Sequence, residues 1–129
     1  MFGLSDKEAR YIKTIERLGG SSVRLRDLAK EMGVSTPSAL EEVRHLMAKG
    51  IVFNDHGYIE LTQKGRSAIE TLRKAHIALE TIFAKQGLTV EEACSEIHTF
   101  DYAVPEHLVQ KLYEAAGKPI LCPKGQAEC

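Results

Sequence analysis

The sequence predicts a mainly α-helical fold with one small β-hairpin, and three observations support this prediction. Apolar residues recur at helical spacing along much of the 129-residue chain. A glycine turn separates two short helical stretches between residues 23 and 50. Two β-branched and aromatic runs, at residues 51–53 and 58–61, enclose four residues with turn chemistry. We therefore expect a short helical pair, a hairpin and then further helices.

The helical pair lies between Val23 and Gly50. Apolar positions from Leu25 to Met32 follow helical spacing, Gly33 breaks the pattern, and a second stripe begins at Ala39. This arrangement is typical of a helix-turn-helix motif, whose second helix lies in the DNA major groove. An ordinary helical hairpin within a bundle is the alternative interpretation.

The hairpin that follows favours the DNA-binding interpretation. A strand at residues 51–53, a four-residue loop and a strand at residues 58–61 would form the wing of a winged helix. Thr62 then suits the N-cap of the next helix. The residues expected to face bases or phosphates lie at the start of the first helix, along the second helix and at the wing tip: Arg24, Arg26, Ser35, Thr36, Pro37, Ser38, Glu41, Arg44 and His56.

The charge of the chain argues mildly against a strong DNA-binding monomer. The formal net charge is −1, and residues 1–70 hold 11 Lys and Arg against 10 Asp and Glu. Phosphate contacts would depend on local cations, Lys49 and Lys64 among them. We therefore expect a homodimer that binds two half-sites of a double-stranded operator. The acidic pair Glu41-Glu42 leaves a second possibility, a winged-helix protein–protein interaction module that binds no DNA.

Three helices are expected after the hairpin. A long helix runs from about residue 63 to 85, and a capping box at Thr89 begins a helix that extends to about Tyr102. Pro105 suits the first residue of a third helix, which Gly117 ends. Apolar faces on these helices favour dimerisation. The expected domains are a DNA-binding domain at residues 1–66 and a helical dimerisation and metal-sensing domain with its tail at residues 67–129.

Candidate metal ligands occur at helical spacing in this second half. Cys94, His98 and Asp101 fall at i, i+4 and i+7, one face of the expected helix, and His76 and Glu80 fall at i, i+4 on the long helix. Imidazoles and carboxylates suit manganese, iron or zinc, and a thiolate shifts the preference toward zinc, iron or cobalt. The alternative interpretation is purely structural, with Cys94 as a small core residue and His98 as a half-buried, hydrogen-bonded residue.

The tail adds two cysteines to these candidates. Cys122 and Cys129 are far apart for a tight metal knuckle, but one interpretation has the tail that carries them fold back toward Cys94 and His98. Such a site would hold zinc or a sulfur-rich iron cluster, or would respond to thiol oxidation. Cys122 is the better candidate of the two.

Taken in order, several segments resemble the diphtheria toxin repressor and manganese transport regulator family. The segments are Tyr11-Ile12-Lys13-Thr14-Ile15, Ser35-Thr36-Pro37-Ser38, Leu61-Thr62-Gln63-Lys64-Gly65-Arg66, Arg73-Lys74-Ala75-His76, Gly87-Leu88-Thr89-Val90-Glu91-Glu92-Ala93 and Cys122-Pro123-Lys124-Gly125. The resemblance implies a dimeric, metal-activated transcription factor, most often a repressor of metal-uptake or homeostasis genes. The resemblance is to the short form of the family, whose members lack the C-terminal SH3-like domain.

The resemblance also implies ligands and exposes departures from the family pattern. His76 and Glu80 match the family's His and Glu on the long helix, and Cys94 falls where some members have an additional His. His98, Asp101 and Tyr102 align with the family's main site, but Tyr102 is a poor ligand because the phenol pKa is about 10. Two N-terminal ligand positions are occupied here by Arg10 and Lys13. A regulator with a lost or altered site is therefore an alternative.

Other function classes find little support. The sequence has no glycine-rich phosphate loop, nucleophile elbow or H-E-x-x-H motif, so we expect no enzyme and no small-molecule substrate. It has no apolar run long enough to span a bilayer and no secretory signal at its start, so we expect a cytoplasmic protein with no membrane partner.

Overall fold

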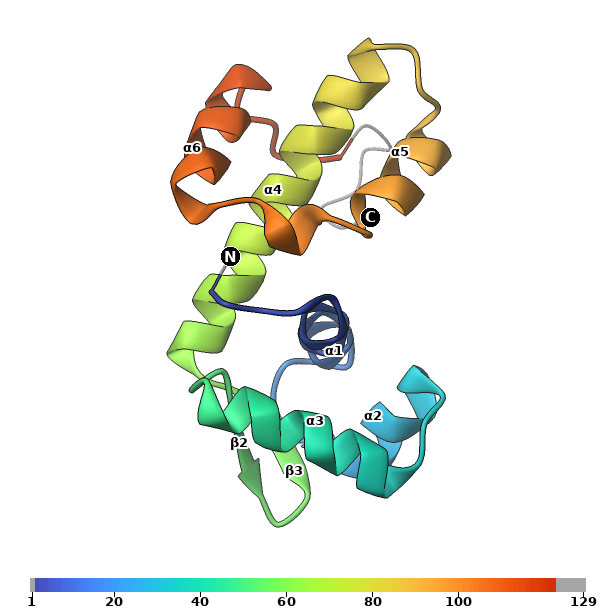
Figure 1. The fold of residues 1–129 in the computed structure, drawn as a ribbon, viewed down its shortest axis with the longest axis vertical. Coiled ribbons are helices and arrows are strands. Elements are labelled where there is room, and N and C mark those ends of the chain that lie inside the picture. The colour runs from blue at the N-terminus through green and yellow to red at the C-terminus, as the bar shows by residue number, and fades with distance from the viewer. Residues whose placement is uncertain (1, 123–129) are drawn as a thin grey trace. The chain divides into compact units, whose positions relative to one another are not determined.

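The structure is a computed structural model, and it describes residues 2–122 (Figure 1). The fold class is as predicted, mainly helical with a small antiparallel sheet. The chain forms two compact units, one made of Lys7–Ile69 and the other of the described residues before and after that range. The elements in chain order are α1 (Asp6–Arg17), β1 (Val23–Arg24), α2 (Leu25–Met32), α3 (Thr36–Ala48), β2 (Val52–Asp55), β3 (Tyr58–Leu61), α4 (Gln63–Lys85), α5 (Val90–Ile97), the 3₁₀ helix η1 (Asp101–Ala103) and α6 (Glu106–Ala115).

The predicted helix-turn-helix is present as α2 and α3. Gly33 ends α2 in the left-handed conformation, with φ of 68°, which an L side chain adopts only with strain. Ser35 then caps α3, because its Oγ accepts a hydrogen bond from the Ser38 backbone N–H at 3.2 Å. Leu28, Val43 and the neighbouring apolar positions are buried in the core of this unit.

The hairpin is tighter than predicted, and the sheet has a third strand. The two strands β2 and β3 are joined by a two-residue turn, not by a four-residue loop. His56 and Gly57 both have positive φ, the geometry of a turn whose twist matches that of the paired strands. The Asn54 side chain also accepts a hydrogen bond from Gly57 N–H at 3.0 Å. The short β1 pairs with β3, so the strand order is β1-β3-β2.

The start of α4 is held tightly against the end of α3. Thr62 Oγ1 accepts a hydrogen bond from the Gly65 N–H at 3.0 Å and donates one to the Gly50 carbonyl at 2.6 Å. A Cβ added at Gly65 would lie 2.2 Å from the Ile51 backbone oxygen. The glycine is therefore required for this close approach.

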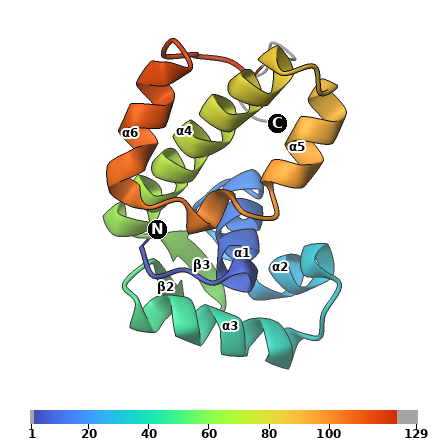
Figure 2. The same cartoon turned by 45° about the horizontal axis from the view of Figure 1, so that its top comes forward.

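In the second unit, α5 and α6 flank α4 on opposite sides (Figure 2). The long helix α4 has the predicted extent, but the helix that follows is shorter than predicted. Thr89 caps α5 through a 3.1 Å bond from the Glu92 N–H, and the helix ends at Ile97 instead of continuing to Tyr102. Among the described residues, no helix is both long and apolar enough to cross a membrane.

Candidate metal centre

The packing of α5 against α4 positions a group of polar side chains. Leu79, Ala93 and Ile97 form a buried apolar cluster, with Phe83, Val104 and Leu112 packed against it. Each of the three buried residues precedes a polar residue of the group, namely Glu80, Cys94 and His98. The apolar contact between the two helices therefore sets the positions of the donor atoms beside it.

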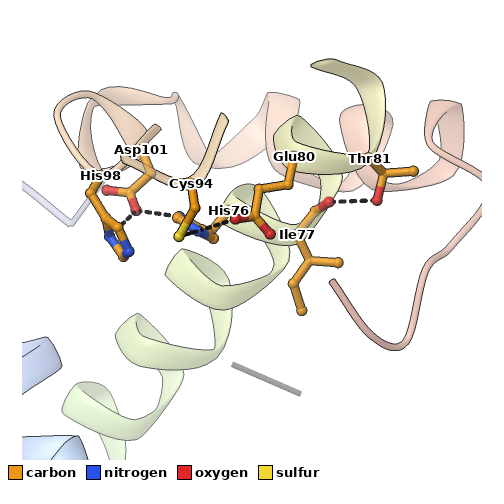
Figure 3. Close-up of polar contacts among 7 residues, drawn as sticks. All are labelled: His76, Ile77, Glu80, Thr81, Cys94, His98 and Asp101. Atoms are coloured by element: carbon orange, nitrogen blue, oxygen red, sulfur yellow. Dashed lines mark hydrogen bonds and ion pairs between the residues drawn. The ribbon is translucent and has the colours of Figure 1, made fainter. Parts of the chain in front are cut away.

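His76 lies at the centre of the group, and each of its ring nitrogens faces a carboxylate oxygen (Figure 3). Its Nδ1 lies 3.2 Å from Asp101 Oδ2, and its Nε2 lies 3.0 Å from Glu80 Oε1. The His76 side chain is buried, and both carboxylates are fully buried. A neutral imidazole donates from only one nitrogen, so only one of the two carboxylates accepts a hydrogen bond from the neutral ring, and the other nitrogen keeps a lone pair.

Cys94 and His98 complete the group on the side of α5. Cys94 Sγ lies 3.6 Å from His76 Nε2. The His98 ring lies 4.2 Å from the His76 ring, centroid to centroid, and its Nδ1 is 3.8 Å from Asp101 Oδ2. The ligand atoms of His76, Cys94 and His98 all lie within 4.8 Å of one another. Because the His98 side chain is 41% exposed, the group can be reached from solvent.

The donor atoms fit a metal ion, and a buried carboxylate oxygen supports this. Glu80 is 0% exposed, and its Oε2 has no hydrogen-bond partner within the described chain. An unpaired carboxylate oxygen in a protein interior is costly, and the usual compensation is a cation or a hydrogen bond. Two imidazoles, a thiol and two carboxylates are together the donors that transition metals bind.

Five of the six predicted metal ligands are thus brought together, although not as predicted. Cys94 and His98 are helical neighbours, but Asp101 does not lie on the same helix, because α5 ends before it. It begins η1, which follows a turn in which Phe100 N–H bonds the Ile97 carbonyl. Asp101 therefore reaches His76 through a chain reversal that periodicity does not reveal.

The remaining predicted positions lie elsewhere. Cys122 is buried and disulfide-bonded, so the prediction that it binds metal is wrong, and it is not among the three residues whose ligand atoms converge. Tyr102 is half-buried in η1. Arg10 and Lys13 belong to α1, whereas every residue of the group comes from the other unit. Cys129 lies outside the described residues.

The predicted DNA-contacting residues all lie at the surface of the Lys7–Ile69 unit. All nine are exposed: Arg24, Arg26, Ser35, Thr36, Pro37, Ser38, Glu41, Arg44 and His56. The Arg24 guanidinium lies 5.7 Å from the centre of the Tyr58 ring, a cation–π contact with β3. His56 occupies the turn of the hairpin, where its Nδ1 lies 2.6 Å from Asp55 Oδ1.

Two other cations that were expected to serve phosphates are already engaged. Lys49 Nζ donates to Glu8 Oε1 at 2.6 Å, and Glu8 is buried. Lys64 Nζ donates to the Lys49 carbonyl at 2.9 Å. Both side chains thus stabilise the fold, and the sequence pattern alone gave no sign of these partners.

A family model matches the second half of the chain. The model describes the metal-binding and dimerisation domain of iron-dependent repressors, and it matches residues 62–129, more than half of the chain. This range contains every residue of the metal-binding group. No curated protein matches the sequence.

Several solved structures have the same fold. A hypothetical protein of Sulfolobus solfataricus is 35% identical, with 95% of this chain and 96% of that chain covered and a TM-score of 0.82. ScaR, solved with bound Zn²⁺, is 25% identical over 95% of this chain, with a TM-score of 0.76. A manganese-dependent transcriptional repressor in complex with manganese is 28% identical over 90% of this chain, with a TM-score of 0.70. This chain spans 62% and 55% of the lengths of the latter two.

Proposed function

This chain belongs to the iron-dependent repressor family of metal-dependent transcriptional regulators, which are not enzymes, and we propose that it is a metal-responsive, homodimeric, DNA-binding repressor. The observation that carries the metal response is the convergence of His76, Cys94 and His98 beside Glu80, whose buried Oε2 has no hydrogen-bond partner among residues 2–122. The matched family model, a metal-binding and dimerisation domain, supports both the metal and the dimer.

We assign DNA binding to the Lys7–Ile69 unit. The N-terminal half of α3 and the turn of the β2–β3 hairpin carry exposed polar residues, which is the arrangement that winged-helix proteins use in the major groove and at the backbone. Arg24, Arg26 and Arg44 supply the phosphate contacts. Because the chain as a whole has a net charge of −1, tight binding requires two such units on one operator.

Helix α4 links the two activities within this proposal. It begins in the DNA-binding unit and carries His76 and Glu80 in the other. When bound, a divalent ion supplies positive charge and coordination bonds that join α4 to α5. His76 and Glu80 hold the α4 side, and Cys94 and His98 hold the α5 side. In a dimer, an ion bound between α4 and α5 in each subunit would favour one separation of the two β2–β3 hairpins. Operators whose half-sites have the matching spacing would then bind more tightly.

The test uses operator duplexes selected from a random library with the metal-loaded protein. Affinity is then measured with stripped and repleted protein, and sedimentation gives the oligomeric state. We expect metal to raise affinity by about 5- to 150-fold. Glu80→Gln should abolish the increase, whereas Glu96→Gln, an exposed change on α5, should retain it. Equal affinity with and without metal contradicts the proposal.

The same duplex selection and affinity measurements distinguish the two alternative functions. A thiol-redox or iron–sulfur regulator would bind the duplex in response to oxidation state and not to metal. A protein–protein interaction module would select no duplex at all. The presence of Cys94 in the group is the observation that keeps the redox rival open.

A further inference from the structure

We propose that this centre selects a thiophilic divalent ion, of the class Zn²⁺, Fe²⁺ or Co²⁺, and discriminates against Mn²⁺, with Cys94 as the residue that sets the choice. The inference rests on the proposed metal response and adds its specificity.

The arrangement of atoms around His76 indicates which nitrogen binds the ion. Asp101 Oδ2 faces Nδ1, while Cys94 Sγ and Glu80 Oε1 both face Nε2. In metal sites a histidine commonly donates its second N–H to a carboxylate, which fixes the tautomer. His76 therefore presents Nε2 to the ion, and Asp101 acts as a positioning residue.

The spacing of the donors suits a small tetrahedral ion. Bonds of about 2.0–2.1 Å to nitrogen and about 2.3 Å to sulfur place tetrahedral ligand atoms roughly 3.5 Å apart. Cys94 Sγ and His76 Nε2 are 3.6 Å apart, and His98 lies within the same 4.8 Å group. Glu80 Oε1 lies beside His76 Nε2, and its Oε2 has no hydrogen-bond partner in the part of the chain that the structure describes. His76, Cys94 and His98 supply three converging donors, and Glu80, in contact with the same His76 Nε2, is the carboxylate that we assign to the fourth position.

The chemistry of this set disfavours manganese. Thiolates are soft ligands that suit zinc, cobalt and ferrous iron, whereas Mn²⁺ prefers carboxylate, carbonyl and water oxygens in octahedral geometry. A thiolate and a carboxylate also neutralise the two charges of the ion inside a buried site. With Asp101 engaged by His76, the set offers Mn²⁺ only one carboxylate.

The test is a Co²⁺ titration of the reduced, metal-stripped full chain, followed by competition with Zn²⁺ and Mn²⁺. We expect the near-ultraviolet band of thiolate-to-cobalt charge transfer and intense visible bands of tetrahedral cobalt. Zn²⁺ should displace the cobalt at stoichiometric amounts, and Mn²⁺ should fail at about a hundredfold excess.

Variants identify the residue responsible. Cys94→Ser should lose the charge-transfer band and reduce the Zn²⁺ over Mn²⁺ preference by at least about tenfold. Ser95→Ala, an exposed change beside Cys94 on α5, is the control and should retain both. If Cys94→Ser fails to fold, His98→Gln replaces it as the test. His98 is partly exposed, and its loss should weaken the visible bands of tetrahedral cobalt.

Three results overturn the inference: cobalt bound without a charge-transfer band, Mn²⁺ bound as tightly as Zn²⁺, or no metal bound. If DNA binding responds equally to Mn²⁺, the selectivity fails while the proposed function stands. If the cobalt spectrum is as expected but DNA affinity is independent of metal, the proposed function fails while the selectivity stands.

Discussion

At the residue scale, the behaviour of the centre depends on single atoms around His76. One imidazole lies between two fully buried carboxylates, with a thiol beside one of its nitrogens. The two carboxylates are removed from water, and their contacts with His76 leave one Glu80 oxygen without a hydrogen bond among the described residues. Such sites are commonly maintained for function at some cost in stability.

Asp101 gives the first prediction at this scale. Asp101→Asn weakens the hold on His76 Nδ1 without removing a donor from the ion. We expect metal affinity to fall by about 10- to 100-fold while the cobalt spectrum keeps its charge-transfer band. A titration followed by absorption gives both quantities. A change in the visible bands of tetrahedral cobalt would instead make Asp101 a ligand, and Glu96→Gln serves as the neutral control.

Tyr11 gives the second prediction, which concerns pH. Burial raises the pKa of the Tyr11 phenol above its ordinary value of 10.0, the Glu42 carboxylate raises it further, and Arg10 partly opposes both. The folded state thus holds this proton more tightly than the unfolded state, so the stabilisation is present below pH 10 and is lost as pH rises through the raised pKa.

Urea unfolding across the alkaline range tests this prediction. The free energy of unfolding of Tyr11→Phe should fall less steeply with rising pH than that of the wild type. Tyr58→Phe, at a ring that is 45% exposed, is the control and should follow the wild type. Parallel curves for Tyr11→Phe and the wild type would show that Tyr11 ionisation does not contribute.

At the scale of elements, close contacts at helix ends determine where each helix begins. Ser35, Thr62 and Thr89 each accept a backbone N–H three residues ahead, and the helices after Thr62 and Thr89 start where the sequence predicts. The end of α5 was not predicted. Its last turn gives way to 3₁₀-type bonds at Thr99 and Phe100, and this reversal brings Asp101 to His76.

Gly65 gives the prediction at this scale. Gly65→Ala introduces a Cβ 2.2 Å from the Ile51 carbonyl oxygen, so α4 or the start of β2 must shift. We expect a loss of about 1–3 kcal/mol in the free energy of unfolding. Chemical denaturation measures it, with the exposed Gln63→Ala on the same helix as control. An unchanged midpoint would mean that the junction adapts at no cost.

At the scale of the whole molecule, the proposed DNA binding requires a local cationic surface, because the chain has a net charge of −1. The exposed arginines of the Lys7–Ile69 unit are candidates, whereas Lys49 and Lys64 have intramolecular partners. The number of phosphates contacted therefore has to be measured and not inferred from composition.

Salt dependence supplies that measurement. Arg24→Ala should reduce the magnitude of the slope of log affinity against log salt by about 1 per subunit, because one phosphate contact is lost. Lys111→Ala, an exposed change on α6, is the charge-matched control and should leave the slope unchanged. A slope near zero for the wild type would contradict phosphate-driven binding and favour the protein–protein alternative.

The sequence by itself determined the helix-turn-helix, the hairpin after it and the caps at Thr62 and Thr89, because apolar periodicity and capping are local and depend on neighbours within a few residues. It also indicated His76 with Glu80 and Cys94 with His98, since each pair is spaced one helical turn apart. The third strand, the two-residue turn at His56-Gly57, the engagement of Lys49 by Glu8 and the place of Asp101 were decided only by the tertiary structure. These features depend on contacts between residues distant in the chain or on a reversal of the chain, which no local pattern encodes.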